Sequence, residues 1–294
     1  MKILVSGLLN TETTAAVRGF PINYYPIDYP FFGVNTSVSG VAFNIAKALT
    51  TLGDEVSLCS MVGEDFEAEY IRRTLAEIGV SDSGVKSVLQ KTPSSVVLYD
   101  PSGARQIYCD LKDIQERQYD FLESALEWVD LVVACNINFN RPLLHLAKKM
   151  GKTVATDVHV LSDSYDVYNR EFMECADILF LSDEAVGDNY RELISRLYDT
   201  YHNKVIVIGR GAEGAAMYLG ESGELIEMPA HQISDVVNTV GAGDALFSAF
   251  VHFYSKGGSP VESLVMAQKF AAHKITVGGA SAGFLTEAEL EGLT

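Results

Sequence analysis

A glycine-rich turn that leads into a single acid places two kinds of chemistry side by side. In the stretch NTVGAGDALFSAF, Gly241, Ala242 and Gly243 stand directly before Asp244. The apolar spacing that follows predicts a buried helix beginning near residue 242. Backbone N–H groups at a helix start have no partners within the helix, so they can hold a phosphoryl group. Asp244 beside them can accept a proton from a hydroxyl and leave it a better nucleophile.

The same acid also has a simpler interpretation. An acidic residue in the first turn favours a helix by about 0.3–1 kcal/mol through the helix dipole and needs no ligand. The position of Asp244 by itself favours neither interpretation, so the choice depends on the rest of the chain.

A second glycine pattern follows an apolar strand. Gly209, Gly211 and Gly214 form a literal GxGxxG, which in a dinucleotide-binding fold must open a helix. Here the next residues, AAMYLGESGELIEMP, predict a β-hairpin with Gly223 in its turn. We therefore do not predict a nicotinamide enzyme, although a glycine turn at a strand end suits the phosphates of a nucleotide.

The elements that must position these residues alternate between strand and helix. Continuous apolar strands separated by helices predict a parallel sheet covered on both faces, within one domain of 294 residues. The expected strands are residues 2–7, 55–63, 130–136, 152–158, 177–182 and 204–209, and the expected helices include 43–53, 68–80 and 141–151.

Two segments interrupt this alternation. Residues 11–38 are rich in Pro, Tyr and Phe, and residues 92–112 predict a hairpin around a turn at 100–103. Both follow early strands and should leave the same edge of the sheet, so we interpret them as a small β lid. The alternative is two unrelated surface loops.

Composition excludes several partners. A net charge of −17 argues against a nucleic-acid partner, which requires a basic surface. The four widely spaced cysteines predict free thiols rather than a zinc site or disulfides. No apolar run is long enough for a membrane span or a secretory signal, so we expect a cytoplasmic protein.

With these patterns in place, the chain resembles the ribokinase-like, or PfkB, family of carbohydrate kinases. The NTVGAGD turn matches the family's C-terminal signature, and SGVAFNIAKALTTLGDEVSLCSMVGED matches its N-terminal one. In the second stretch Ser39 replaces the first glycine, whereas Gly40, Asn44, Ala46, Gly53 and Gly63 match. The resemblance covers nearly the whole chain and implies a three-layer αβα fold with a mostly parallel central sheet and a β-sheet lid.

The resemblance also implies an activity and assigns residues to it. It implies ATP-dependent phosphorylation of a sugar hydroxyl, with Mg²⁺ bridging the ATP phosphates and held largely through water. Asp244 would be the catalytic base and residues 241–243 the anion hole. The acceptor would be bound by Asn10, Glu12, Gly40, Asn44 and Asn136, and ATP by Ser182, Gly209, Gly211, Gly214 and, near the adenine, His273.

The chain departs from the family pattern at several of these positions. Glu12 stands where an Asp is usual, and the Asn-x-x-Glu motif for magnesium and phosphate is reduced to SDEA at 182–185, where Asp183 or Glu184 could substitute. Gly209 replaces a usual Thr or Ser. Asn238 replaces an Asp that in relatives bears on a monovalent-cation site, so potassium activation is uncertain.

Other residues keep two interpretations. Arg105 in the predicted hairpin either closes on substrate or is a solvated arginine, and Asp157 and His159 are expected to be strand-end pocket residues rather than metal ligands. The aromatic residues of the first lid segment either cover a ligand or form a homodimer interface, which we favour: Tyr24, Tyr25, Tyr29, Phe31 and Phe32.

The function predicted is an ATP-dependent sugar kinase. Two alternatives remain, a nucleoside kinase of the same fold and a non-catalytic sugar- or nucleotide-binding regulatory protein.

Overall fold

The structure is a computed structural model that describes residues 1–233 and 235–293. Its centre is a nine-stranded sheet in the order β13-β12-β11-β10-β9-β8-β1-β4-β5. From β11 to β5 neighbouring strands pair in parallel, whereas β12 pairs antiparallel with β11 and β13. The strands are β1 (Lys2–Ser6), β4 (Glu55–Val62), β5 (Val85–Ser87), β8 (Leu131–Ala134), β9 (Thr153–Val160), β10 (Ile178–Ser182), β11 (Val205–Gly209), β12 (Ala215–Leu219) and β13 (Glu224–Met228). The mostly parallel sheet is confirmed.

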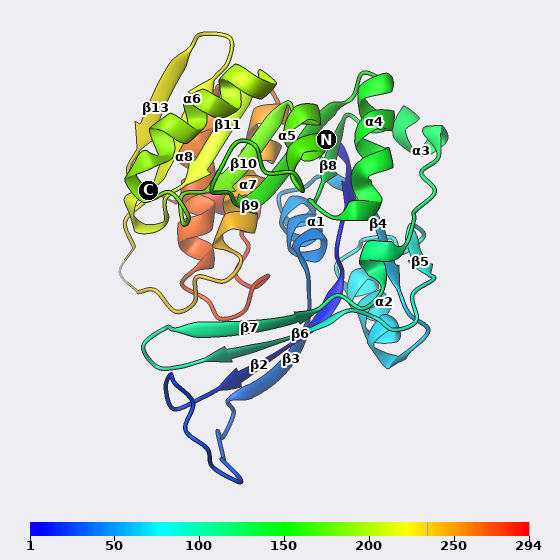
Figure 1. The fold of residues 1–294 in the computed structure, drawn as a ribbon, viewed down its shortest axis with the longest axis vertical. Helices are drawn as coiled ribbons and strands as arrows, with labels where there is room; N and C mark the ends of the chain where they lie inside the picture. The colour runs from blue at the N-terminus through cyan, green and yellow to red at the C-terminus, as the bar shows by residue number, and fades with distance from the viewer. Residues whose placement is uncertain (234, 294) are drawn as a thin grey trace.

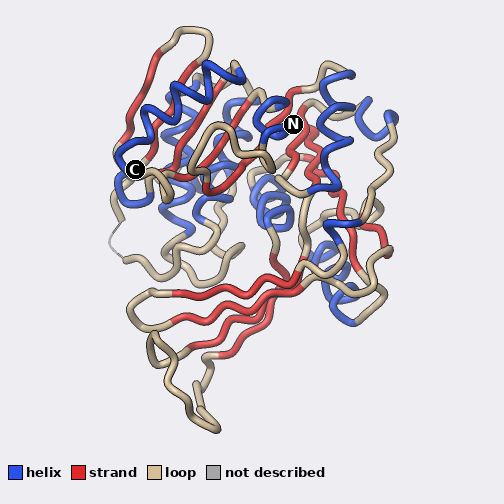
Figure 2. Tube along the Cα trace, in the orientation of Figure 1, coloured by secondary structure: helices blue, strands red, loops and turns tan. Residues whose placement is uncertain are grey.

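Helices cover both faces of this sheet, as the ribbon and the trace show (Figures 1 and 2). One face carries α1 (Val41–Thr51), α2 (Phe66–Glu77), α7 (Ala242–Ser255), α8 (Pro260–Lys274) and α9 (Glu287–Glu291). The other carries α3 (Glu123–Glu127), α4 (Arg141–Lys149), α5 (Arg170–Cys175) and α6 (Tyr190–Tyr201). In β1, Ile3 and Val5 pack toward the first set and Leu4 toward the second. Both faces are therefore buried, which explains why the central strands are continuously apolar.

Short 3₁₀ turns link several of these elements. They are η1 (Ile114–Glu116), η2 (Asn138–Asn140), η3 (Gly187–Asn189) and η4 (Gly211–Glu213). The GxGxxG segment is thus followed by one 3₁₀ turn and then by the β12–β13 hairpin, as its sequence predicted. This arrangement confirms that the glycine pattern does not open a dinucleotide-binding helix.

The two irregular segments form a second sheet. Its four strands lie in the order β3 (Val34–Ser39), β2 (Asn10–Ala16), β6 (Ser94–Tyr99), β7 (Arg105–Asp110), and they extend below the main body in Figure 1. Strand β2 pairs in parallel with β6, whereas the other two pairs are antiparallel. The lid is confirmed, and the alternative of two unrelated loops is wrong. The organisation into one domain remains a prediction.

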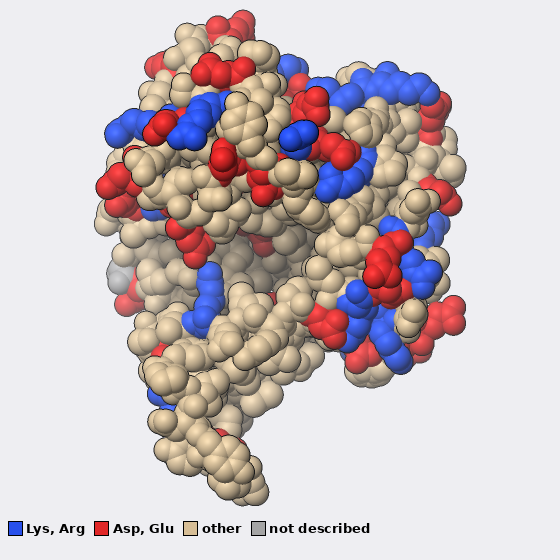
Figure 3. All heavy atoms as spheres, viewed as in Figure 1, with Lys and Arg blue, Asp and Glu red and all other residues tan. Residues whose placement is uncertain are grey.

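The far end of the lid carries the aromatic residues of the first segment. All five side chains are exposed, from 49% for Tyr25 to fully for Phe32, and this end is largely uncharged in Figure 3. Arg18 and Asp28 form an ion pair at 2.8 Å there, and the Arg18 guanidinium lies 4.3 Å from the centre of the Tyr25 ring. The four cysteines are free thiols, as predicted. Within residues 1–233 and 235–293, no helix combines the length and apolar character needed to cross a bilayer.

Candidate active site

A cavity of about 860 Å³ lies where the carboxyl ends of β9, β10 and β11 face the lid. The hollow between the body and the lid is visible in the space-filling view (Figure 3). In open α/β sheets this end of the strands is the usual place for a ligand. The cavity is lined by nine of the residues predicted for catalysis, acceptor binding or ATP binding: Arg105, Ser182, Gly209, Gly211, Gly214, Gly241, Ala242, Gly243 and Asp244.

The start of α7 brings the glycine turn to this cavity. Gly241 is the N-cap residue with φ of 79°, and no side chain caps the helix. A Cβ at Gly241 would lie 2.1 Å from the Ala280 carbonyl oxygen, so only glycine fits this left-handed, tightly packed position. The bare helix start therefore depends on Gly241.

One of the three predicted anion-hole amides has a partner in the chain. The Ala242 N–H donates to the carbonyl of Thr239 at 3.2 Å, which closes the turn. This bond argues against the predicted role of Ala242 as a phosphate donor. In the part of the chain that the structure describes, the amides of Gly241, Gly243 and Asp244 make no such bond. The amides that remain available to an anion are thus those of Gly241, Gly243 and Asp244 rather than the set of 241–243.

Asp244 lies on the wall of the cavity with one partner for its carboxylate. The side-chain amide of Asn44, from α1, donates to Oδ2 at 2.7 Å. Protein packs around the carboxylate although one side opens to the cavity, and this burial raises the pKa of Asp244, while the Asn44 bond opposes the rise. Among the described residues, Oδ1 has no hydrogen-bond partner. A carboxylate with a raised pKa and a vacant oxygen suits a proton acceptor.

Charged groups surround this acid. Burial raises the pKa of Glu12 on β2, to which the Ser39 hydroxyl donates at 3.4 Å. Arg105 reaches from the lid to the turn, with 3.3 Å between its Nη1 and the Thr239 hydroxyl. Arg105 therefore lines the cavity and also ties the lid to the glycine turn, unlike a merely solvated arginine.

Two predicted acceptor-binding asparagines carry buried oxygens without a partner. Asn10 donates its amide to Ser95 Oγ at 3.1 Å, and Asn44 donates to Asp244, but both Oδ1 atoms lack hydrogen bonds. Each side chain is only 4% exposed. Buried acceptors without partners are costly, and neither asparagine is among the residues that line the cavity. Gly40, the N-cap of α1, has φ of 105°, and a Cβ there would lie 2.4 Å from the Leu8 carbonyl oxygen.

Six of the predicted site residues are absent from the cavity lining: Asn10, Glu12, Gly40, Asn44, Asn136 and His273. Asn136 donates its amide to the side-chain oxygen of Asn169 at 3.1 Å. His273 directs Nδ1 to the Gly283 carbonyl at 3.0 Å, whereas Ala271, Ala272 and Ile275 of the same segment do line the cavity. The roles assigned to Asn136 and His273 therefore remain predictions.

Only some of the polar side chains of the reduced SDEA segment, residues 182–185, line the cavity. Ser182 and Glu184 line it, and the Glu184 amide donates to the Ser182 hydroxyl at 3.2 Å. Asp183 instead faces Arg210 at 3.6 Å. The described residues hold no group of three His, Cys, Asp or Glu side chains arranged to bind a metal ion. Of the two predicted substitutes, Glu184 is the one that faces the cavity.

The histidine at the end of β9 is held in an unusual backbone conformation. His159 has φ of 60°, and the β9–β10 register shifts at this point, which indicates a bulge. Its amide donates to Asp157 Oδ1 at 2.8 Å, and both residues line the cavity, as expected for strand-end pocket residues. Bulges of this kind often re-aim a side chain beside an active site.

Lys274, at the end of α8, is a site residue that the sequence analysis missed. Its side chain is fully buried, and its charge acts on both Asp244 and Glu12. A lysine in the last turn of a helix ordinarily indicates a surface cation that favours the helix dipole, so its type and position gave no signal.

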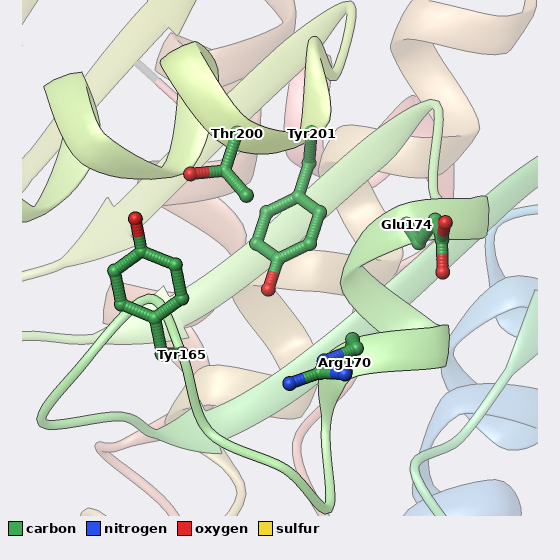
Figure 4. A pocket seen from close by; sticks show the side chains of 5 residues that line it. All are labelled: Tyr165, Arg170, Glu174, Thr200 and Tyr201. Carbon is green, nitrogen blue, oxygen red and sulfur yellow. The ribbon is translucent and has the colours of Figure 1, made fainter.

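A second hollow, of about 480 Å³, lies apart from these residues. Figure 4 shows its lining side chains, which come from α5, α6 and the segment before α5: Tyr165, Arg170, Glu174, Thr200 and Tyr201. None of them is a predicted site residue, and none lines the larger cavity.

The comparisons with known proteins agree with this fold. Residues 2–287 match the model of the pfkB family of carbohydrate kinases, and the chain belongs to that family. It is 26% identical over 307 residues to the ATP-dependent ribose-1-phosphate kinase of Halopiger xanaduensis, covering 98% of this chain and 99% of that protein. The family and its named kinases support the predicted enzyme class, an ATP-dependent sugar kinase.

Two further matches differ in what they cover. The bifunctional protein HldE of Helicobacter pylori is 25% identical over 275 residues, which cover 85% of this chain, but the chain spans only 57% of the length of HldE. The solved structure of the microbiome-derived acarbose kinase Mak1 has a TM-score of 0.88 at 22% identity, covering 99% of this chain and 98% of that one. The second match confirms the predicted fold.

Proposed function

We propose that the protein transfers the γ-phosphoryl group of ATP to a hydroxyl of a small sugar. The observation that carries the proposal is the placement of Asp244 on a cavity, held through one oxygen by Asn44, at the uncapped start of α7. An acid with this burial and a vacant oxygen can take a proton, and the amides beside it can stabilise negative charge.

In the proposed reaction the acceptor hydroxyl donates to Asp244 as its oxygen attacks the γ-phosphorus. The new oxygen–phosphorus bond forms as the bond to the bridging oxygen of ADP breaks, and the proton stays on Asp244 until it is lost to solvent. The amides of Gly241, Gly243 and Asp244 stabilise charge on the transferred group. Ser182, Gly209, Gly211 and Gly214 would line the ATP phosphates.

Magnesium would neutralise charge on the ATP phosphates, as in other phosphoryl transfers. The described residues offer no ready-made set of ligands, so the ion would be held mainly by phosphates and water, with Glu184 as the nearest cavity carboxylate in the reduced SDEA segment.

The polar groups beneath the lid favour a sugar over a nucleoside as the acceptor. The Oδ1 atoms of Asn10 and Asn44 lack partners but are closed to solvent and outside the cavity lining in this structure, and they would match the hydroxyl donors of a sugar that reached them. Stacking on a nucleobase would be served by an exposed aromatic ring, but Phe180, the phenyl ring in the described lining, is 2% exposed and packs against Phe247 and Phe250. The exposed aromatics of the lid lie outside that lining, and we propose that they form a homodimer interface instead.

ADP release over a panel of sugars and nucleosides, with magnesium ATP, tests this function. We expect turnover with at least one sugar and much weaker turnover with nucleosides. Turnover confined to nucleosides would show that the acceptor is a nucleoside rather than a sugar. Saturable sugar or ATP binding without ADP release would favour the non-catalytic regulator and overturn the proposal.

A further inference from the structure

The ammonium group of Lys274 is held inside the protein directly behind the glycine turn. Lys274 is the last residue of α8, and its side chain is 0% exposed. Its Nζ donates to the carbonyl of Asn238 at 3.3 Å and to the carbonyl of Val240. Both carbonyls belong to the segment that leads into Gly241.

The end of α8 holds the other backbone groups of this segment as well. The amides of Val237 and Asn238 donate to the Ile275 carbonyl at 2.8 and 3.1 Å. The Val240 amide donates to the Asn238 side-chain oxygen at 2.8 Å. Lys274 supplies the donor for the carbonyls of Asn238 and Val240, while the Thr239 carbonyl between them accepts from Ala242.

This pairing sets the direction of an anion-binding amide. The carbonyl of Val240 and the N–H of Gly241 belong to one trans peptide unit, so they point in opposite directions. Because the carbonyl is directed at Lys274, the Gly241 N–H is directed away from it, and Gly241 lines the cavity. Loss of the ammonium would free this peptide unit to rotate.

Two buried carbonyl oxygens that converge on one point form a site for a positive charge. An alkali cation could take that position in a chain without the lysine. The family resemblance connects the first residue of this turn with a monovalent cation, but here that residue is the neutral Asn238, and Nζ of Lys274 stands against its carbonyl. A carboxylate that would balance a second positive charge is absent at position 238. The residues present therefore do not fit a separate cation.

We infer that the Lys274 ammonium is a built-in replacement for a monovalent cation, and that it acts as a positioning residue for the 241–244 turn. This inference rests on the proposed kinase function for its effect on catalysis. Lys274 does not touch the reacting atoms. It acts by fixing the peptide unit before Gly241, and the protein accordingly needs no added potassium.

The charge of Lys274 depends on pH within an accessible range. Burial lowers its pKa to about 8, while Asp244 and Glu12 oppose that fall and Arg105 adds to it. The carboxylates come from α7 and β2 and the guanidinium from β7. Above about pH 8 the ammonium loses its proton, and the two carbonyls lose their cation.

Replacing the lysine tests the inference through rescue. In tetramethylammonium chloride, Lys274→Ala should lower kcat by about 10- to 100-fold, as expected when a catalytic turn is misplaced, with a smaller change in KM. Potassium chloride at equal ionic strength should restore much of kcat, because alanine leaves room for the ion. Lys274→Met fills that room and should not be rescued. The wild-type rate should be the same in both salts.

Lys269→Ala is the matched control. Lys269 lies on the same helix and also donates to a carbonyl, that of Leu293 at 2.9 Å, but it is remote from the turn's hydrogen bonds. Its kcat should equal that of wild type in either salt. In wild type kcat should fall as pH rises past about 8, whereas the potassium-rescued Lys274→Ala should lack this fall.

Thermal melting supplies a readout that needs no substrate. Potassium, compared with tetramethylammonium, should raise the melting temperature of Lys274→Ala and leave that of wild type unchanged. Wild-type activation by potassium, or a Lys274→Ala protein with normal kcat in both salts, would overturn the inference. If Lys274→Ala does not fold, the wild-type salt comparison decides. If wild type phosphorylates nothing, the proposed function fails, and the melting experiment still tests the cation site.

Discussion

Two carboxylates near opposite ends of α7, the half-buried Asp244 and the buried Asp54, have very different surroundings. At the first turn, Asp244 has one side-chain partner, Asn44, and lies on a cavity. Near the last turn, His252 meets Asp54, which is 5% exposed and accepts two strong bonds: 2.7 Å from Nδ1 of His252 and 2.8 Å from the Met1 ammonium.

The difference lies in how completely each charge is compensated. Asp54 is surrounded by donors, and the other imidazole nitrogen of His252 lies 3.6 Å from Glu287, so this cluster joins α7 to α9 and to the start of β4. Asp244 keeps one oxygen vacant and has a raised pKa. A fully paired buried acid contributes to the fold, whereas an under-paired acid beside a cavity is available for chemistry.

Asp244→Asn should produce the largest change in this comparison. It removes the proposed proton acceptor, so kcat should fall by about 10²–10⁴-fold with ATP affinity nearly unchanged. A raised folded-state pKa means that the neutral form favours folding at low pH and that this contribution is lost as pH rises through the pKa. At neutral pH the variant should therefore melt at the wild-type temperature or above it.

Steady-state kinetics, ATP titration and thermal melting measure these three quantities. Asp199→Asn, an exposed acid on α6, is the control and should match wild type in all of them. Wild-type kcat in Asp244→Asn would place the base elsewhere. A large drop in melting temperature would make Asp244 a structural acid like Asp54.

Asn44→Leu should produce the next largest change. It removes the donor that holds Oδ2 of Asp244, and a hydrogen bond to a charged group is worth about 1.5–3 kcal/mol, or roughly 10- to 150-fold in kcat/KM. That bond lowers the pKa of Asp244, so its loss should raise the pKa further. The proposed mechanism requires the ionised acid, and the acid limb of the kcat/KM–pH profile should therefore move to higher pH.

Asn203→Leu provides the matched control for that profile. Asn203 is also a buried asparagine, but it donates to the carbonyls of Met173 and Ala176 on the other side of the sheet. It should reduce stability and leave the acid limb in place. An unmoved limb in Asn44→Leu would mean that this asparagine does not set the protonation of Asp244.

The contrast between the two ends of α7 also explains what the sequence could predict. The turn and Asp244 were predictable because their chemistry depends on adjacent residues, and the sheet was predictable because strands buried on both faces are continuously apolar. The lid was predictable because its two segments interrupt the alternation of strands and helices, but its strand order was not predictable. That order depends on pairing between β2 and β6, which are far apart in the chain.

The parts that could not be predicted depend on packing between distant elements. Lys274 occupies a position in the last turn of a helix where a lysine is usually exposed. Only the folding of the turn against α8 buries it. The Ala242 amide donates to the Thr239 carbonyl and so is not available to an anion. This bond depends on the left-handed backbone at Gly241. Asn44 was assigned through the family resemblance, whereas its bond to Asp244 became visible only in the folded chain.

Asp54→Asn, at the other end of α7, should affect stability and leave chemistry intact. The substitution keeps the shape of the side chain but leaves buried donors poorly paired, which costs about 1–3 kcal/mol. Urea unfolding measures this loss, and kcat per folded molecule should equal that of wild type. Glu77→Gln is the control, because it breaks an exposed pair with Arg73 at 3.9 Å, which is worth less than about 0.5 kcal/mol. If Asp54→Asn cost no more than Glu77→Gln, or lowered kcat as Asp244→Asn does, the division of α7 into a structural and a chemical end would be wrong.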